Sequence, residues 1–198
     1  MRIGAFAANV VVLLLFGIGI PWLKGIEFLD LFLLIPYALL GVFYTSPRAV
    51  AAAFEPPISL AALGRAALVG WAIGVLILAM GLATVNISVG HELLPPVPVL
   101  LCLAVLGLMA CLLTAAVAVR VAMAAATESA ARARIRIGFL LLLCLFLAAP
   151  RMMGDELTGT VLGWMTPEGM VRVTMVLAPM MAVGTLFLLR VRLARYTG

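Results

Sequence analysis

Few side chains in this sequence are of the types that catalyse reactions or bind metals. The single histidine is His91, which lies in a short segment that ends at Pro95 and Pro96. A metal or haem site normally needs more nitrogen or sulfur ligands than one imidazole, so we interpret His91 as a solvated loop residue. We therefore expect neither a metal nor a cofactor.

The cysteines have no spacing typical of redox or zinc sites. They are Cys102, Cys111 and Cys144, and no Cys-x-x-Cys pair occurs. On one helix, Cys102 and Cys111 lie about 13 Å apart along the axis, which is too far for a disulfide. We interpret all three as small apolar packing residues.

Two pairs of carboxylates could bind a cation. Glu27 and Asp30 are three residues apart, and Asp155 and Glu156 are adjacent. The interpretation we favour is that they mark the acidic, non-cytoplasmic side of a membrane protein. No G-x-S-x-G motif occurs, and no serine lies deep in an apolar run. We therefore expect that the protein is not an enzyme.

The composition excludes several classes of protein. Of the 198 residues, 66% are hydrophobic and only 11% are charged, and the mean hydropathy is +1.29. So few charges cannot cover a water-soluble surface, which excludes a soluble domain and a disordered tail. The net charge of +5 does not indicate nucleic-acid binding, because the basic residues lie between long apolar runs.

The apolar runs predict a single all-α domain over residues 1–198, a bundle of six transmembrane helices in a lipid bilayer. A span needs about 20 mostly apolar residues. The predicted spans are 5–23, 28–44, 66–89, 99–119, 135–149 and 171–189. The fifth is short, and we expect its helix to begin earlier, because Arg132, Arg134 and Arg136 can extend to the membrane surface.

The basic residues predict the orientation. With six spans, 10 of the 13 Lys and Arg residues fall on the side of both termini. The other side holds Lys24, Arg151 and Arg172. This bias predicts a multi-pass protein of a bacterial-type inner (plasma) membrane with both termini in the cytoplasm.

Proline residues predict where helices begin and end. Ser46 and Pro47 are typical of an N-cap and a first helical residue, and they predict a short cytoplasmic helix over 47–55. Pro56 and Pro57 would end it. Thr166 and Pro167 predict the start of the last helix in the same way. Residues 152–170 predict an interfacial or re-entrant segment.

Small residues recur at helical spacing in two spans. One set is Ala104, Gly107, Cys111, Thr114 and Ala118, and the other is Gly70, Gly74 and Gly81. Such faces let helix backbones approach closely. We expect packing within the chain first and a homo- or hetero-oligomeric interface second. Asn9, Asn86 and Thr114 are the predicted sites of hydrogen bonds between helices.

The layout resembles the permease half of ABC-2-type exporters. The shared features are six spans, cytoplasmic termini, the short helix after span 2, a basic connection after span 4 and the segment before span 6. The resemblance implies that residues 47–55 contact a separate ATPase, and we take Arg48 and Glu55 as the contact residues. This chain has no G-x-x-x-x-G-K-[ST] motif of its own.

The cores of the six spans lack Asp, Glu, Lys, Arg and His, which argues against a proton-coupled carrier. We therefore expect a permease-like subunit that is driven by a separate ATPase and handles hydrophobic or lipid-like cargo. A non-catalytic accessory or scaffold subunit is the alternative. A third hypothesis is a membrane enzyme that acts through Glu27, Asp30, Asp155 or Glu156.

Overall fold

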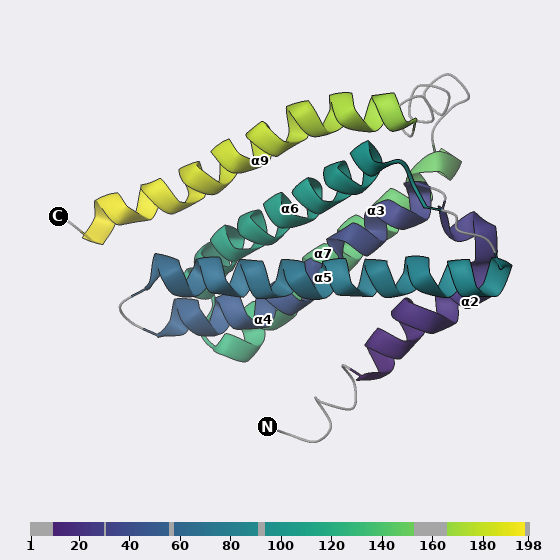
Figure 1. Ribbon diagram of the computed structural model, residues 1–198. Helices are drawn as coiled ribbons and strands as arrows, with labels where there is room; N and C mark the ends of the chain where they lie inside the picture. Colours follow the sequence, from purple (N-terminus) through teal and green to yellow (C-terminus); the bar gives the residue numbers. More distant parts are fainter. Residues whose placement is uncertain (1–9, 30, 56–57, 91–93, 153–165, 197–198) are drawn as a thin grey trace.

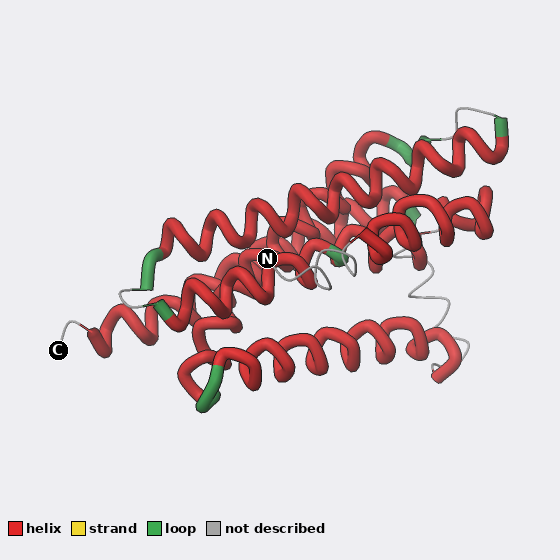
Figure 2. The backbone as a smooth tube through the Cα atoms, turned by 90° about the horizontal axis from the view of Figure 1, so that it is seen from below, coloured by secondary structure: helices red, strands yellow, loops and turns green. Residues whose placement is uncertain are grey.

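The structure, a computed structural model, describes residues 10–29, 31–55, 58–90, 94–152 and 166–196 (Figure 1). All regular structure in these ranges is helical, as predicted (Figure 2). A helix that begins at Val10 continues through the π-helical turn η1 (Leu15–Gly19), α2 (Ile20–Lys24) and the 3-10 turn η2 (Gly25–Leu29). The following helices are α3 (Leu31–Leu39), α4 (Gly41–Phe54), α5 (Leu60–Val89), α6 (Val97–Ala124), α7 (Glu128–Met152) and α9 (Pro167–Tyr196).

Four helical segments are long and apolar enough to cross a membrane. They are Val10–Glu27, Leu60–Val89, Val97–Ala124 and Pro167–Arg190, and they include most of the predicted first, third, fourth and sixth spans. The prediction of an all-α protein with apolar, membrane-length helices is confirmed for these four segments, whereas a bundle of six spans is not.

The predicted span 28–44 is not one continuous helix. It is divided at Leu40, whose N–H donates to the Tyr37 carbonyl oxygen at 3.1 Å and not to the carbonyl oxygen of Pro36. The Phe43 N–H in turn donates to the Leu40 oxygen at 3.1 Å. This tight turn separates α3 from α4.

The start predicted for the short helix at Pro47 is wrong, because Pro47 lies inside α4, which begins at Gly41. Proline has no N–H, so the Phe43 carbonyl loses its usual donor four residues later. The Ser46 hydroxyl donates to that carbonyl oxygen at 3.4 Å and thus supplies a replacement. The predicted end is correct, since α4 ends at Phe54, before Pro56 and Pro57.

Other helix ends follow the sequence closely. The Thr166 hydroxyl accepts from the Gly169 N–H at 3.1 Å, and α9 begins at Pro167, as predicted. The Thr127 hydroxyl accepts from the Ala130 N–H at 3.2 Å. The helix of the fifth span therefore begins at Glu128, earlier than its apolar run, also as predicted.

The helices pack side by side along one long axis, with α4, α5 and α6 in mutual contact (Figure 1). The helix that begins at Val10 packs on α5, and α9 packs on α6. Figure 2 shows that α7 stands to one side of the other helices, where it contacts α4 and α6. The C-terminal end of α4, the N-terminal end of α5 and the turn between α6 and α7 lie at one end of the bundle. The C-terminal end of α5 and the N-terminal end of α6 lie at the other.

Candidate functional site

The predicted small-residue faces of α5 and α6 lie against the junction of α3 and α4. A Cβ atom added at Gly74 would lie 2.9 Å from the Gly41 nitrogen, and one at Gly107 would lie 2.7 Å from the Ala38 oxygen. A Cβ atom at Gly70 would clash with Thr45. The backbone of the α3–α4 junction thus lies nearly in contact with the backbones of α5 and α6, where only glycine fits.

The remaining small residues have different surroundings. Gly81, Cys111 and Ala118 are buried. The Ala104 carbonyl oxygen accepts a hydrogen bond from Trp71 Nε1 at 2.9 Å, which joins α6 to α5. The hydroxyl of Thr114 donates to Ala110 of its own helix at 2.7 Å, so the prediction of a bond from Thr114 to another helix is wrong.

Other hydrogen bonds between helices come from residues that the sequence analysis did not single out for this role. Besides Trp71, the Thr84 hydroxyl donates to the Gly17 oxygen at 3.0 Å. Arg120 Nε donates to the Leu188 oxygen at 3.2 Å and joins α6 to α9. The acceptors are backbone carbonyls, which every residue carries, so a search for polar side chains in pairs misses these bonds.

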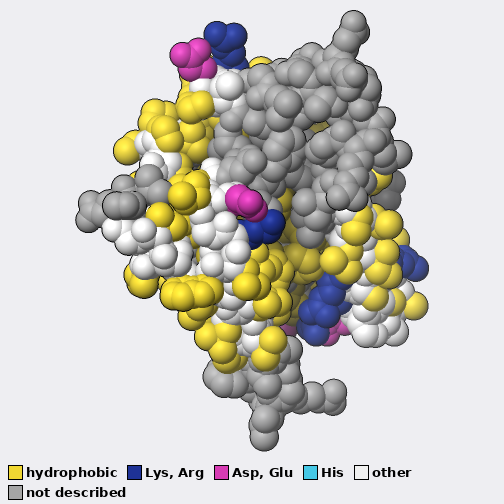
Figure 3. Space-filling view, turned by 90° about the vertical axis from the view of Figure 1, so that its right-hand side faces the viewer, with side chains coloured by type: hydrophobic (Ala, Val, Ile, Leu, Met, Phe, Trp, Pro, Cys, Tyr) yellow, Lys and Arg dark blue, Asp and Glu magenta, His cyan; other side chains and the backbone are white. Residues whose placement is uncertain are grey.

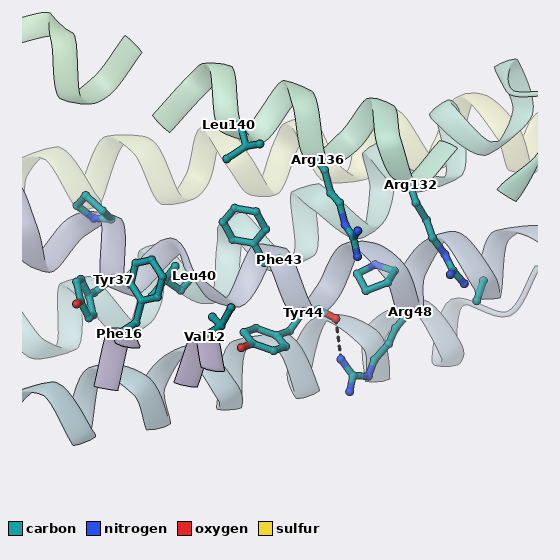
Figure 4. A pocket seen from close by; sticks show the side chains of 13 residues that line it. Val12, Phe16, Tyr37, Leu40, Phe43, Tyr44, Arg48, Arg132, Arg136 and Leu140 are labelled. Atoms are coloured by element: carbon teal, nitrogen blue, oxygen red, sulfur yellow. Dashed lines mark hydrogen bonds between the residues drawn. The ribbon is translucent and has the colours of Figure 1, made fainter. Parts of the chain in front are cut away.

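A cavity of about 910 Å³ lies between the helix that begins at Val10, the α3–α4 pair and α7. Figure 4 shows that its two ends differ in chemistry: aromatic and aliphatic side chains line one end, and arginines line the other. The lining residues are Val12, Phe16, Pro36, Tyr37, Leu40, Phe43, Tyr44, Pro47, Arg48, Ala51, Arg132, Arg136 and Leu140. From Tyr37 to Arg48 the helical rise gives a length of about 16 Å.

The apolar end is built from packed aromatic rings. The centroids of the Phe16 and Tyr37 rings lie 5.9 Å apart in an edge-to-face arrangement. Phe43 packs edge to face on Phe139 of α7 with 4.4 Å between centroids. These contacts fix the positions of the rings that face the cavity. The hydroxyl of Tyr44 is buried and has no hydrogen-bond partner within the described part of the chain.

The polar end holds three arginines from two helices. Arg48 of α4 donates to the Tyr44 carbonyl oxygen at 2.8 Å, and Arg132 of α7 pairs with Glu128 one turn earlier. Nε of Arg132 is buried, and no described group accepts from it. Arg136 forms no hydrogen bond or ion pair with any residue that the structure describes. Several donors at this end are therefore free to bind an anion.

Figure 3 views the molecule along its long axis. Basic side chains lie in a recess between two masses of hydrophobic side chains on this face. This arrangement agrees with a cavity whose walls are largely apolar and whose charge is concentrated at one place.

The two predicted ATPase-contact residues are separated by the fold. Arg48 lines the cavity, whereas Glu55 is exposed just after the end of α4 and does not line it. Between them, Ala49 and Val50 are fully buried against α5 and α6. The segment 47–55 is therefore packed into the bundle along one face and exposed along the other.

Of the acidic pairs and His91, the structure describes only Glu27. Glu27 pairs with Lys24 at 3.2 Å, and both side chains are exposed. Asp30, His91, Asp155, Glu156, Asn9 and most of the segment 152–170 lie outside the described residues. Among the described residues, no group of three or more His, Cys, Asp or Glu side chains could hold a metal ion. Cys102 and Cys111 are buried as predicted, whereas Cys144 is exposed.

No protein-family model, no curated protein sequence and no solved structure matches this chain. The chemistry of the cavity is consequently the basis on which a function can be argued.

Proposed function

We propose that the protein is a permease-like subunit of a membrane transport complex and that it binds a hydrophobic or lipid-like molecule in the cavity beside α7. The observation that carries this proposal is the cavity itself, of about 910 Å³. Its size lies in the range of small-molecule sites, and most of its lining is aromatic or aliphatic. Its walls belong to a bundle with four helices long and apolar enough to span a membrane.

The position of the cavity supports a cargo that comes from the bilayer. One wall is α7, which contacts only part of the bundle and carries exposed apolar residues such as Leu141 and Leu145. A molecule with a long apolar part loses little on moving from lipid into a cavity lined by rings and aliphatic chains. A water-soluble cargo could form few hydrogen bonds at the apolar end of the cavity and would bind there less favourably.

The source of energy in this proposal is a separate ATPase. The cores of the predicted spans contain no Asp, Glu, Lys, Arg or His, so an ion gradient has no buried group on which to act. The chain also lacks a G-x-x-x-x-G-K-[ST] motif. The exposed end of α4 at Glu55 is the surface that we assign to the ATPase.

The first experiment tests cargo binding. A tryptophan at Leu140, which lines the cavity, should fill part of its volume and reduce labelling of the protein by a photoreactive diacylglycerol several-fold. Leu141→Trp is the matched control, because Leu141 is a neighbouring exposed leucine of α7 that does not line the cavity. Equal labelling of both variants and the wild type would mean that the diacylglycerol binds only to the outer surface of the protein and not in the cavity.

The second experiment tests the ATPase. Wild-type protein purified from native membranes in mild detergent should retain a nucleotide-binding chain, and Glu55→Arg should reduce its recovery. Ser129→Arg adds a positive charge at another exposed position and should leave recovery unchanged. If the wild type retains no nucleotide-binding chain, the permease proposal fails, and a non-catalytic accessory subunit replaces it.

A further inference from the structure

The polar end of the cavity carries more positive charge than its surroundings neutralise. Three guanidinium groups line it, those of Arg48, Arg132 and Arg136, and Glu128 is the carboxylate paired with one of them. Two positive charges at this end thus have no carboxylate partner among the residues that the structure describes. Two arginines lie one helical turn apart on α7, and the third faces them from α4 (Figure 4).

The donors at this end suit a tetrahedral anion better than a single carboxylate. Each guanidinium is a planar fork that binds phosphate oxygens through two parallel N–H donors. Arg136 has no partner among the described residues, and Nε of Arg132 is buried without an acceptor. The side chains of Arg48 and Arg136 are exposed, so a ligand in the cavity can reach their N–H donors.

The apolar and basic ends belong to one continuous cavity. A ligand that fills it must be apolar over the part beside Phe16, Leu40 and Phe43 and anionic at the part beside the arginines. A phosphate monoester carries a charge of about −1.5 to −2 near neutral pH, which matches the uncompensated charge.

We propose that Arg48, Arg132 and Arg136 bind the headgroup of a phosphate-bearing lipid whose acyl chain lies against the aromatic end of the cavity. This inference rests on the proposed function and assigns its cargo to a chemical class. Arg48 lies near the C-terminal end of α4, and Arg132 and Arg136 lie near the N-terminal end of α7. These two helix ends are at the same end of the bundle. The lipid is therefore oriented with its phosphate toward this end.

The test compares two single-chain lipids with the same acyl chain, monoacylglycerol and its phosphate ester, lysophosphatidic acid. Binding to the purified full-length protein in detergent is measured by isothermal titration calorimetry. The phosphate ester should bind about tenfold more tightly or better, because each charge-assisted bond to the headgroup adds affinity. Inorganic phosphate alone should bind far more weakly, since it makes no contact with the apolar end.

The variant Arg136→Gln should reduce the affinity for the phosphate ester by about tenfold and leave that for monoacylglycerol unchanged. Arg136→Lys should restore part of the affinity, because the charge remains but the planar fork is lost. The matched control is Arg65→Gln, an exposed arginine of α5 that does not line the cavity. Thermal unfolding of each variant checks that the fold is retained.

Each outcome separates the two proposals. If the two lipids bind equally well and Arg136→Gln behaves like Arg65→Gln, the phosphate assignment is overturned while the lipid-binding function stands. If neither lipid binds, the proposed function itself fails. If inorganic phosphate binds as tightly as lysophosphatidic acid, the arginines form a site for a free anion and not for a lipid.

Discussion

Glycine at four positions sets the distance between helix backbones at the centre of the bundle. Gly41 at the start of α4 lies against Gly70 and Gly74 of α5, and Gly107 of α6 lies against Ala38. A side chain at any of these four positions would meet backbone or tightly held atoms, which cannot move aside as the end of a flexible side chain can. These positions therefore control how deeply α4 sits between α5 and α6, and hence where the cavity wall lies.

The substitution Gly70→Ala tests this account at the residue scale. We expect it to destabilise the protein by about 1–3 kcal/mol, because the new methyl group overlaps Thr45. On the same helix, Gly64→Ala adds a methyl group with nothing within 4 Å. That control should be neutral or stabilising by up to about 1 kcal/mol, since alanine favours helix over glycine. Thermal unfolding in detergent measures both, and equal shifts in melting temperature would contradict the proposed close contact.

At the scale of the helix, α4 continues through a proline because a neighbouring side chain compensates for the lost donor. Pro47 leaves the Phe43 carbonyl without its backbone partner, and the hydroxyl of Ser46 donates to it at 3.4 Å. Ser46 is almost fully buried, so water does not easily replace the hydroxyl. The uninterrupted helix places Tyr44 and Arg48 along one wall of the cavity.

A double-mutant cycle tests this compensation. Ser46→Ala should cost about 1 kcal/mol in the natural sequence, because it leaves the partly buried Phe43 carbonyl without a donor. In a Pro47→Ala background the same change should cost less, since the alanine introduced there has a backbone N–H that can donate to the Phe43 carbonyl. Ser88→Ala on α5 removes a similar hydroxyl bond, to Val85 at 2.9 Å, where no proline follows, and it should be near neutral. Equal costs of Ser46→Ala in both backgrounds would show that the hydroxyl does not substitute for the missing N–H.

In the molecule as a whole, one end of the helix bundle carries more basic side chains than the other. Described arginines near the α4–α5 and α6–α7 connections are Arg48, Arg65, Arg120, Arg132, Arg134 and Arg136. Lys24, which pairs with Glu27, lies toward the other end, as does Arg172 near the start of α9. Such segregation predicts that the first end faces the cytoplasm.

Labelling of single cysteines tests this orientation. Cys102, Cys111 and Cys144 are first replaced by alanine, and cysteine is then introduced at one exposed position at a time. Glu55→Cys and Ser129→Cys should react with a membrane-impermeant reagent from the cytoplasmic side, and Leu94→Cys should react only from the opposite side. If Leu94→Cys and Ser129→Cys react from the same side, α6 does not span the membrane and the orientation is wrong.

The sequence was sufficient for the elements whose signals are local. Apolar length predicted α5, α6 and α9, and Thr166 with Pro167 predicted the start of the last helix. The cavity was not predictable in this way, because its walls come from three stretches of chain around Phe16, Phe43 and Arg136 that only the fold brings together. The sequence predicts that Arg132 and Arg136 extend to the membrane surface and that Arg48 contacts an ATPase, and it places none of them in a cavity. A basic residue at a helix end has the same pattern whether it faces water or a cavity.

The most direct test of the account is to identify what occupies the cavity in the membrane. A photoreactive phenylalanine analogue, p-benzoylphenylalanine, is placed at Phe43, which lines the cavity, or at Leu76, which is exposed on α5. The protein is extracted, washed extensively in detergent and irradiated, and adduct masses are measured. We expect a lipid-sized, phosphate-bearing adduct at position 43 and none at position 76, where detergent has replaced the lipid. No adduct at position 43, or the same adduct at both positions, would contradict it.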